Sequence, residues 1–129
     1  MFMSADIAKL LLRLSVGILM LFHGVHKIIN GIGGVKHLVN NAGLPEFIAY
    51  GVYVGEVIIP IFILLGLYAR VASLFLAFNM LMAIFLAYGS SLFATGKHGG
   101  LLIELPLFYL VLSIVIFLLG SGKYAVNSK

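Results

Sequence analysis

Five side chains that could bind a ligand or carry protons lie within long apolar runs of the sequence: His23, Lys27, Glu56, Asn79 and Glu104. An ionisable group in a bilayer core costs roughly 3 kcal/mol even on mild insertion scales, so such groups usually pair, line a cavity or serve a function. His23 and Lys27 are four residues apart and share one helix face. Helical rise places these two residues, Glu56 and Glu104 in the outer half of a membrane bundle, away from the chain termini.

This cluster is compatible with three kinds of role. A neutral histidine can donate to a carbonyl and exchange protons near neutral pH, so His23 and the two carboxylates could move protons to or from a quinone-like ligand. The same groups could instead form structural pairs, Lys27–Glu104 and His23–Glu56, that lock the helices together. A path for a small solute or for protons is the third interpretation.

A metal site is a weaker alternative. Nitrogen and oxygen ligands for zinc or iron would come from His23, His26, Glu56 and Glu104. The segment HGVHK places its two histidines three residues apart beside a lysine, and the chain has no HExxH or ExxH motif. The sequence therefore predicts no specific metal ligands.

Other polar residues are expected to have structural or surface roles. Arg13 is placed to reach lipid head groups, or to pair with Asp6 or with the C-terminal tail. Four loop residues are expected to be exposed, where they could rim an entry to the site: Lys36, His37, Lys97 and His98.

The composition indicates an integral membrane protein. The chain has 129 residues, of which 63% are hydrophobic and 9% charged, whereas soluble domains carry about 25% charged residues. This length allows a single domain, residues 1–129. The absence of cysteine excludes a disulfide and a thiolate nucleophile, so redox chemistry would need a cofactor, a metal or a partner. The net charge of +4 comes from residues at helix ends, and no nucleic-acid binding is expected.

Four long apolar runs predict an all-α four-helix membrane bundle with spans at about 7–29, 47–67, 71–93 and 99–119. The N-terminus lacks a signal-peptide pattern, so the first span is expected to be retained. A short amphipathic helix is expected between the first two spans, with Val35, Leu38 and Val39 on one face. Pro60 should loosen the second span about one turn after Glu56. The tail after Leu119 is expected to be exposed. Small residues favour close helix packing at Gly17, Gly24, Gly51, Gly55 and Ala83.

Four spans place both termini on one side of the membrane. Five basic residues are expected on that side and three on the other, which favours cytoplasmic termini. The terminal side would carry Lys9, Arg13, Arg70, Lys123 and Lys129, and the outer side Lys27, Lys36 and Lys97.

The sequence resembles the DoxX family. The segment LLRLSVGILMLFHGVHKI matches the RLxxG and HGxxK elements of its first helix, and GLP, LLGLYAR, GGLLIE and GSGKYAV follow in the expected order. Asn127 departs from the acidic residue that relatives often carry there. The resemblance implies a multi-pass protein of a bacterial or archaeal inner membrane, since family members include the membrane subunit of archaeal thiosulfate:quinone oxidoreductase. It carries over Arg13, His23, Lys27, Glu56 and Glu104 as the matching polar positions.

We therefore expect a membrane subunit of a quinone-linked oxidoreductase with a protein partner or further copies of itself. His23 and Lys27 would contact the ligand's oxygen atoms, while Glu56 and Glu104 would hold them and relay protons. The sequence has no haem, flavin or iron–sulfur signature, so electrons would come from a partner or directly from substrate. The alternatives are a non-enzymatic membrane scaffold that recruits redox or metal-handling partners, and a small-solute or proton permease that would need to oligomerise.

Overall fold

The computed structural model describes residues 2–89, 94–95 and 99–127 of the chain. The long first helix α1 (Phe2–Asn30) is followed by the short helix α2 (Gly33–Asn41). An irregular helical segment of residues 46–65 comprises η1 (Glu46–Tyr50), α3 (Gly51–Tyr53), η2 (Val54–Ile58) and α4 (Ile59–Leu65). Helices α5 (Ala69–Tyr88) and α6 (Glu104–Leu119) complete the fold. The described residues include one isolated bridge, between Thr95 and Leu101, but no strand, as predicted for an all-α protein.

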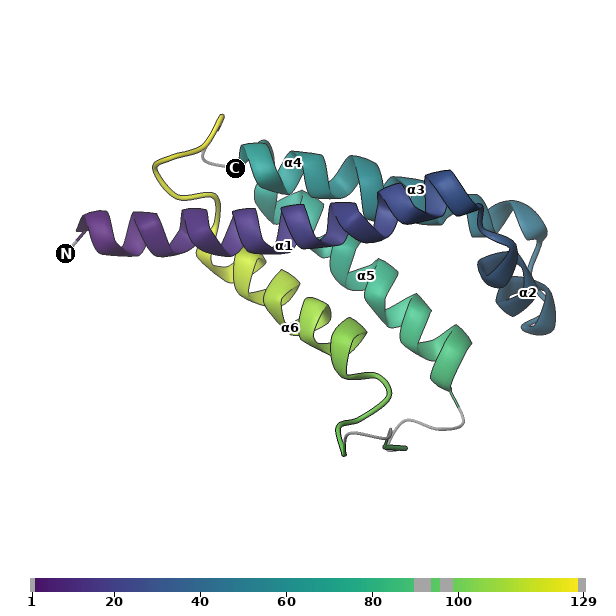
Figure 1. The fold of residues 1–129 in the computed structure, drawn as a ribbon. Coiled ribbons are helices and arrows are strands. Elements are labelled where there is room, and N and C mark those ends of the chain that lie inside the picture. The colour runs from purple at the N-terminus through teal and green to yellow at the C-terminus, as the bar shows by residue number, and fades with distance from the viewer. Residues whose placement is uncertain (1, 90–93, 96–98, 128–129) are drawn as a thin grey trace.

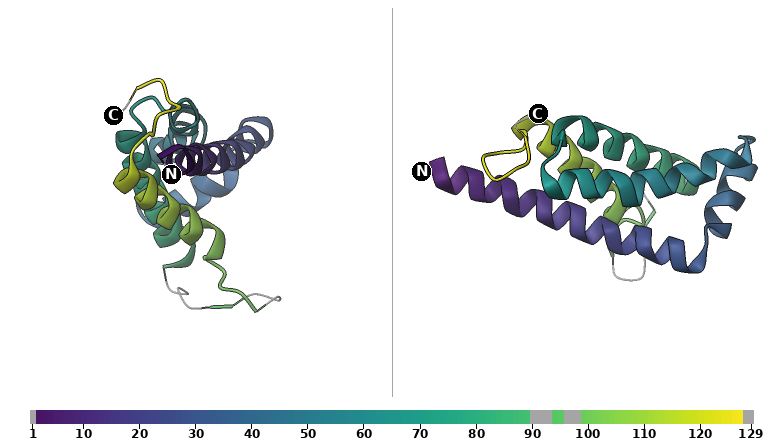
Figure 2. Two further views of the ribbon diagram at one scale, coloured as in Figure 1. Left: turned by 90° about the vertical axis from the view of Figure 1, so that its left-hand side faces the viewer. Right: turned by 90° about the horizontal axis from the view of Figure 1, so that it is seen from above.

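The helices form two pairs that cross obliquely (Figure 1). α1 runs beside the 46–65 segment, and α5 runs beside α6. The pairs meet near the chain termini and spread apart toward the end where α2 lies. The start of α1 and the C-terminal residues of the described chain lie at the same end of the bundle (Figure 2).

Helices occupy the regions of the first three expected spans: α1 includes 7–29, the 46–65 segment covers most of 47–67, and α5 covers 71–88. The predicted fourth span, 99–119, begins too early, because residues 99–103 form bends and turns and α6 starts at Glu104. Gly99 has a φ of +85°, which interrupts a right-handed helix, and Pro106 lies in the first turn of α6, where its missing N–H has no cost. The predicted end of the third span, residues 90–93, lies outside the described part of the chain.

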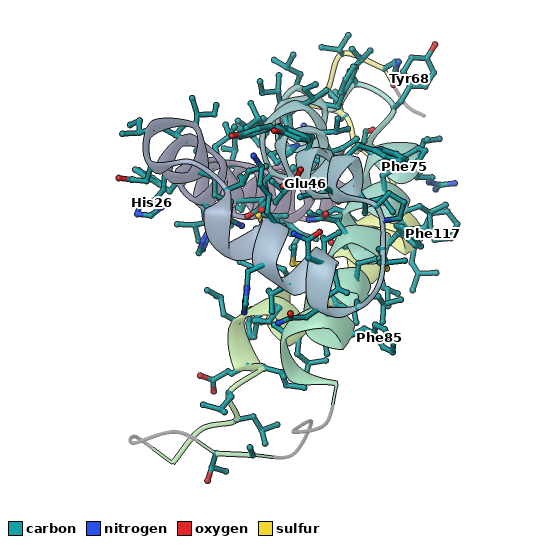
Figure 3. The ribbon with its side chains drawn as sticks, turned by 90° about the vertical axis from the view of Figure 1, so that its right-hand side faces the viewer. His26, Glu46, Tyr68, Phe75, Phe85 and Phe117 are labelled. Atoms are coloured by element: carbon teal, nitrogen blue, oxygen red, sulfur yellow. The ribbon has the colours of Figure 1, made fainter. Side chains whose placement is uncertain are left out.

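Two helical segments, Glu46–Leu65 and Ala69–Ala87, are long and apolar enough to cross a membrane, and α6 is a shorter apolar helix. Large apolar side chains point away from the bundle, among them Phe75 and Phe85, which are 59% and 68% exposed (Figure 3). Soluble monomers rarely expose so much contiguous apolar surface. This exterior suits contact with lipid.

Two buried clusters hold the helices together. The main cluster joins Val16 of α1 to Ile63 of α4, Leu76 of α5 and Ile116 of α6. A smaller one joins Val39 of α2 to Ile32 and Ala49. The predicted amphipathic helix is confirmed as α2, in which Val39 is buried and Val35 and Leu38 are half-buried.

The C-terminal tail is exposed in part, as expected, with Lys123, Tyr124 and Val126 exposed, but it also bonds to the rest of the fold, which was not expected. The backbone N–H of Val126 donates to the carbonyl of Leu65 over 3.0 Å. The Asn127 side chain accepts from the backbone N–H of Tyr68 at 3.0 Å, and the Asp6 carboxylate accepts from the N–H of Lys123 at 3.1 Å. The tail therefore connects the turn between α4 and α5 to the start of α1.

Arg13 links the tail to the end of α4. Its side chain is buried, and its Nη1 donates to the carbonyls of Ile63 and Leu64 at 3.3 and 3.0 Å, while Nη2 donates to the carbonyl of Tyr124. The last carbonyls of a helix lack intrahelical donors, which explains why a guanidinium is accommodated here. Of the roles expected for Arg13, the contact with the tail is the one observed.

Candidate functional site

A pocket of about 680 Å³ lies between the helix pairs, and side chains of α2 form part of its lining. Most of the lining is apolar, and the polar side chains on it are His23, Lys27, Glu56, Asn79 and Tyr109. Small-molecule sites typically enclose about 300–1,000 Å³ and combine an apolar lining with a few convergent polar groups. The pocket has both properties.

Lys27 and Glu56 form an ion pair across the α1 interface, in which Lys27 Nζ donates to Glu56 Oε2. The Glu56 side chain is 5% exposed and that of Lys27 is 30% exposed. Two opposite charges that share a hydrogen bond offset part of each other's burial. This is the only ion pair among the described residues, and neither predicted pair, Lys27–Glu104 or His23–Glu56, is observed.

Glu104 lies outside the pocket. It is exposed in the first turn of α6 and lines a separate hollow of about 320 Å³ with Leu101, Leu107 and Phe108. The reason is the rotation of α6, since Glu104 is five residues before the buried Tyr109 and so lies roughly 140° around the helix from it. The prediction that Glu104 joins the cluster assumed that it shared the inward face.

Glu56 lies within a turn of π-helix, η2, which ends at Ile58, two residues before Pro60. Pro60 has no N–H to donate to the carbonyl of Glu56, and the N–H of Ile59 bonds to the carbonyl of Val54, five residues back. The expected irregularity near Pro60 is therefore present, but it lies on the N-terminal side of the proline. π-Turns of this kind are frequent at functional sites.

Gly24 allows α1 to approach this turn closely. A Cβ atom at Gly24 would lie 2.2 Å from the carbonyl oxygen of Glu56. This distance is too short for any side chain, so only glycine fits here. One helical turn later, Lys27 reaches the Glu56 carboxylate. Gly17 repeats the arrangement seven residues earlier, where a Cβ would lie 3.0 Å from the carbonyl oxygen of Pro60. The expected close packing at Gly17 and Gly24 is confirmed, whereas nothing approaches within 4 Å at Gly51.

Asn79 of α5 packs against Gly55, next to Glu56. A Cβ at Gly55 would lie 2.5 Å from Asn79 Cγ, so the glycine leaves room for the amide. Asn79 lines the pocket, and its amide has no hydrogen-bond partner in the described part of the chain. It offers both a donor and an acceptor to a molecule in the pocket.

Among the polar side chains that line the pocket, Tyr109 is the one that was not predicted from the sequence. Its side chain is buried, and its ring meets that of His23 edge to face, with centroids 6.0 Å apart and an interplanar angle of 89°. Its position within an apolar run was a usable signal, because a buried tyrosine hydroxyl needs a polar partner. His23 itself is exposed on one side while it lines the pocket on the other.

The remaining predicted polar residues lie away from the pocket. His26 is exposed and points outward from α1 (Figure 3), and its carbonyl accepts a hydrogen bond from Asn30. His37 contacts Asn41 on the exposed face of α2. No group of three acidic or histidine side chains that could hold a metal occurs in residues 2–89, 94–95 and 99–127. Lys97 and His98 lie outside the described residues.

Lys36 fastens α2 to the start of the 46–65 segment. Its ammonium lies 4.9 Å from the centre of the Tyr50 ring, within the range of a cation–π contact. Interaction with the Tyr50 side chain, by hydrogen bonding and then by charge, raises the pKa of Lys36 above its ordinary value.

Comparison with known proteins gives one family and one curated relative. The family model described as DoxX matches residues 8–89. A Bacillus subtilis (strain 168) protein named "Putative oxidoreductase CatD" is 33% identical over 81 residues, which are 63% of this chain and 60% of that protein. The chain therefore spans less than two thirds of that relative's length. No solved structure matches. The family match includes His23, Lys27, Glu56 and Asn79 and ends before α6.

Proposed function

The chain belongs to the DoxX family of membrane proteins, and from this premise we propose that it is the membrane subunit of a quinone-linked oxidoreductase. The family supports contact with a lipid bilayer, and the name of the Bacillus subtilis relative supports a role associated with oxidoreductases. The assignment of the ligand rests on the pocket, whose mostly apolar lining carries a few polar side chains.

The donor groups on the pocket wall suit the oxygen atoms of a quinone. The Lys27 ammonium has three N–H donors, of which Glu56 engages one. The free amide of Asn79 and the imidazole of His23 supply further donors on the same pocket. The rest of the lining is apolar and matches a ring with a hydrocarbon substituent. When bound, a quinone supplies reversible two-electron, two-proton chemistry.

Each polar residue has a distinct role in this proposal. Glu56 holds the Lys27 side chain against the pocket and neutralises its charge in apolar surroundings. Asn79 orients the ligand ring. His23 exchanges protons, since it reaches both the pocket and the exterior and an imidazole can both accept and donate a proton. Glu104 has no part in the proposal because it lies outside the pocket.

The proposed membrane arrangement has four spans, formed by α1, the 46–65 segment, α5 and α6, with the termini on the cytoplasmic side of a bacterial or archaeal inner membrane. The extensive exposed apolar surface supports this arrangement. Reporter fusions at the N-terminus and at the loop between α5 and α6 test it. Reporters active on the same side of the membrane would contradict it.

The ligand assignment is tested by purifying the protein in mild detergent and identifying bound lipids by native mass spectrometry and extraction. We expect a quinone to co-purify with the wild type and to be lost from the Glu56→Gln and Asn79→Leu variants. Glu104→Gln is the matched control, since it removes a carboxylate outside the pocket. A wild type that neither retains a quinone nor binds an added one would refute the proposal.

A further inference from the structure

The pocket reaches the exterior of the bundle along an apolar edge. Val54 of η2 and Phe75 and Phe78 of α5 line the pocket, yet they are 48%, 59% and 63% exposed. A side chain that both lines a pocket and faces outward marks its opening. We name these three residues the apolar lip. None of their side chains has a polar atom.

Packing closes part of the pocket beneath α2. Val39 of α2 and Ala49 of η1 are each 1% exposed and pack together with Ile32. Lys36 holds α2 in place through Tyr50. Gly51 and Ala87 also line the pocket near this end and are exposed, but they offer a hydrocarbon chain at most a methyl group to pack against. The larger exposed apolar side chains of the lining lie on the sides of the bundle.

A third exposed part of the lining, which includes His23, differs from the apolar lip in chemistry. His23 and Leu105 also line the pocket and face outward, from α1 and α6. A hydrocarbon chain that left on this side would lie against the imidazole and keep its polar atoms from hydrogen-bond partners, which costs free energy. The apolar lip imposes no such cost.

The positions of the polar side chains in the pocket then determine how an amphipathic ligand is oriented. Lys27, Glu56 and Asn79 would engage its polar head, and its hydrocarbon part would face the apolar lining. A pocket of about 680 Å³ holds a molecule of drug size, so a long chain must extend out of it. The apolar lip leads such a chain into lipid.

We propose that the pocket takes a quinone bearing a long isoprenoid chain, and that the chain leaves between Val54 and the pair Phe75 and Phe78 into the bilayer. This inference rests on the proposed function and specifies the class of ligand. The apolar lip favours binding of a quinone that carries a hydrocarbon chain over a quinone without one.

Two probes separate recognition of the ring from recognition of the chain. Menadione has a naphthoquinone ring without a chain, and menatetrenone has the same ring with an isoprenoid chain. Binding of each is measured to wild type and variants in nanodiscs of one lipid composition. Each probe partitions into the lipid to the same extent in every sample, so a difference in affinity between two variants for one probe reflects the protein.

Val54→Phe narrows the lip, and Ile58→Phe is its matched control. Ile58 lies one turn further along the same segment, is 47% exposed and does not line the pocket. We expect Val54→Phe to weaken menatetrenone binding about tenfold, while menadione binding stays unchanged. Ile58→Phe should leave both unchanged.

Phe78→Ala tests the lip from α5, in case Val54→Phe disturbs the π-turn. Phe85→Ala is the control, since Phe85 is 68% exposed on the same helix and does not line the pocket. Loss of the ring from Phe78 should weaken menatetrenone binding several-fold and spare menadione, whereas Phe85→Ala should have no effect.

Equal changes for both probes, or equal changes in lip and control variants, would overturn the inference while leaving the proposed function intact. Failure of the wild type to bind either probe would refute the proposed function itself.

Discussion

Lys27 of α1 forms an ion pair with Glu56 of η2, and the glutamate is almost wholly shielded, with 5% of its side chain exposed. The pair joins the first helix to the most irregular turn of the second helical segment. It lies on the wall of the main pocket, so packing, helix geometry and ligand chemistry all depend on the same two residues.

Breaking the ion pair from one side should destabilise the protein. Lys27→Met leaves a buried carboxylate without its partner and should lower the free energy of unfolding by about 3 kcal/mol. The double variant Lys27→Met/Glu56→Gln should cost less than the sum of the single changes, because both charged partners are gone. Circular dichroism during denaturant unfolding in detergent measures this. As control, Lys27→Met/Glu104→Gln should be additive, and similar coupling there would contradict the observed pairing.

Gly24→Ala should separate α1 from the π-turn. The added Cβ would lie 2.2 Å from a backbone oxygen that cannot rotate away, so the helices must shift, at a cost of about 3 kcal/mol. Thermal unfolding measures the loss. Gly34→Ala is the control, since nothing lies within 4 Å of Gly34 and alanine favours its helix. A Gly24→Ala protein as stable as the control would show that the close approach is unnecessary.

Gly55→Ala should displace the Asn79 side chain and weaken quinone binding. The new Cβ would lie 2.5 Å from Asn79 Cγ. Adding Asn79→Ala should restore stability, by about 1 kcal/mol or more, because the shorter side chain frees the space. Quinone affinity should not recover, since the amide is lost. Recovery of both properties in the double variant would exclude Asn79 as a ligand contact.

Arg13→Lys should release the C-terminal tail. A lysine ammonium cannot match the spread of the guanidinium across the carbonyls of Ile63, Leu64 and Tyr124, so about 2 kcal/mol of stability should be lost. Limited trypsin digestion should cleave faster after Lys123. Lys36→Gln is the control, because it removes a cation at the other end of the molecule. Unchanged cleavage in Arg13→Lys would mean that the backbone bonds of the tail suffice.

The helices and much of the pocket wall were predictable from the sequence. The spacing of His23 and Lys27 put both on one helix face, and the structure places both on the pocket. Depth along the helices likewise grouped Glu56 with them, and Asn79 was a candidate because it is a polar residue within an apolar run. These predictions depend on counting residues along apolar runs, and such counts give the position of a residue along its helix well.

Glu104 shows where counting fails. Depth along an axis does not determine which face of a helix a residue occupies, because that depends on where the helix begins and how it rotates against its neighbours. A boundary error of five residues left the rotation of α6 undetermined. The π-turn at Glu56 was similarly beyond prediction in detail, since Pro60 signals an irregularity but not its form.

The contacts of the C-terminal tail with the rest of the fold were missed for another reason. Its bonds are to backbone carbonyls and amides at the turn after α4, and backbone groups leave no signature in the sequence. The buried arginine was a hint, because Arg13 needs acceptors, but the sequence does not show which carbonyls supply them.

The partners of Arg13 also impose an order on biogenesis. The chain emerges from the ribosome N-terminus first, so Arg13 enters its surroundings with the first helix. Its acceptors at Ile63 and Leu64 emerge only after some fifty further residues, and Tyr124 emerges 111 positions after Arg13. The nascent first helix must therefore keep its cation hydrated or held by another protein until Ile63 and Leu64 have been made, and translation arrested before Tyr124 would leave that charge without its last acceptor.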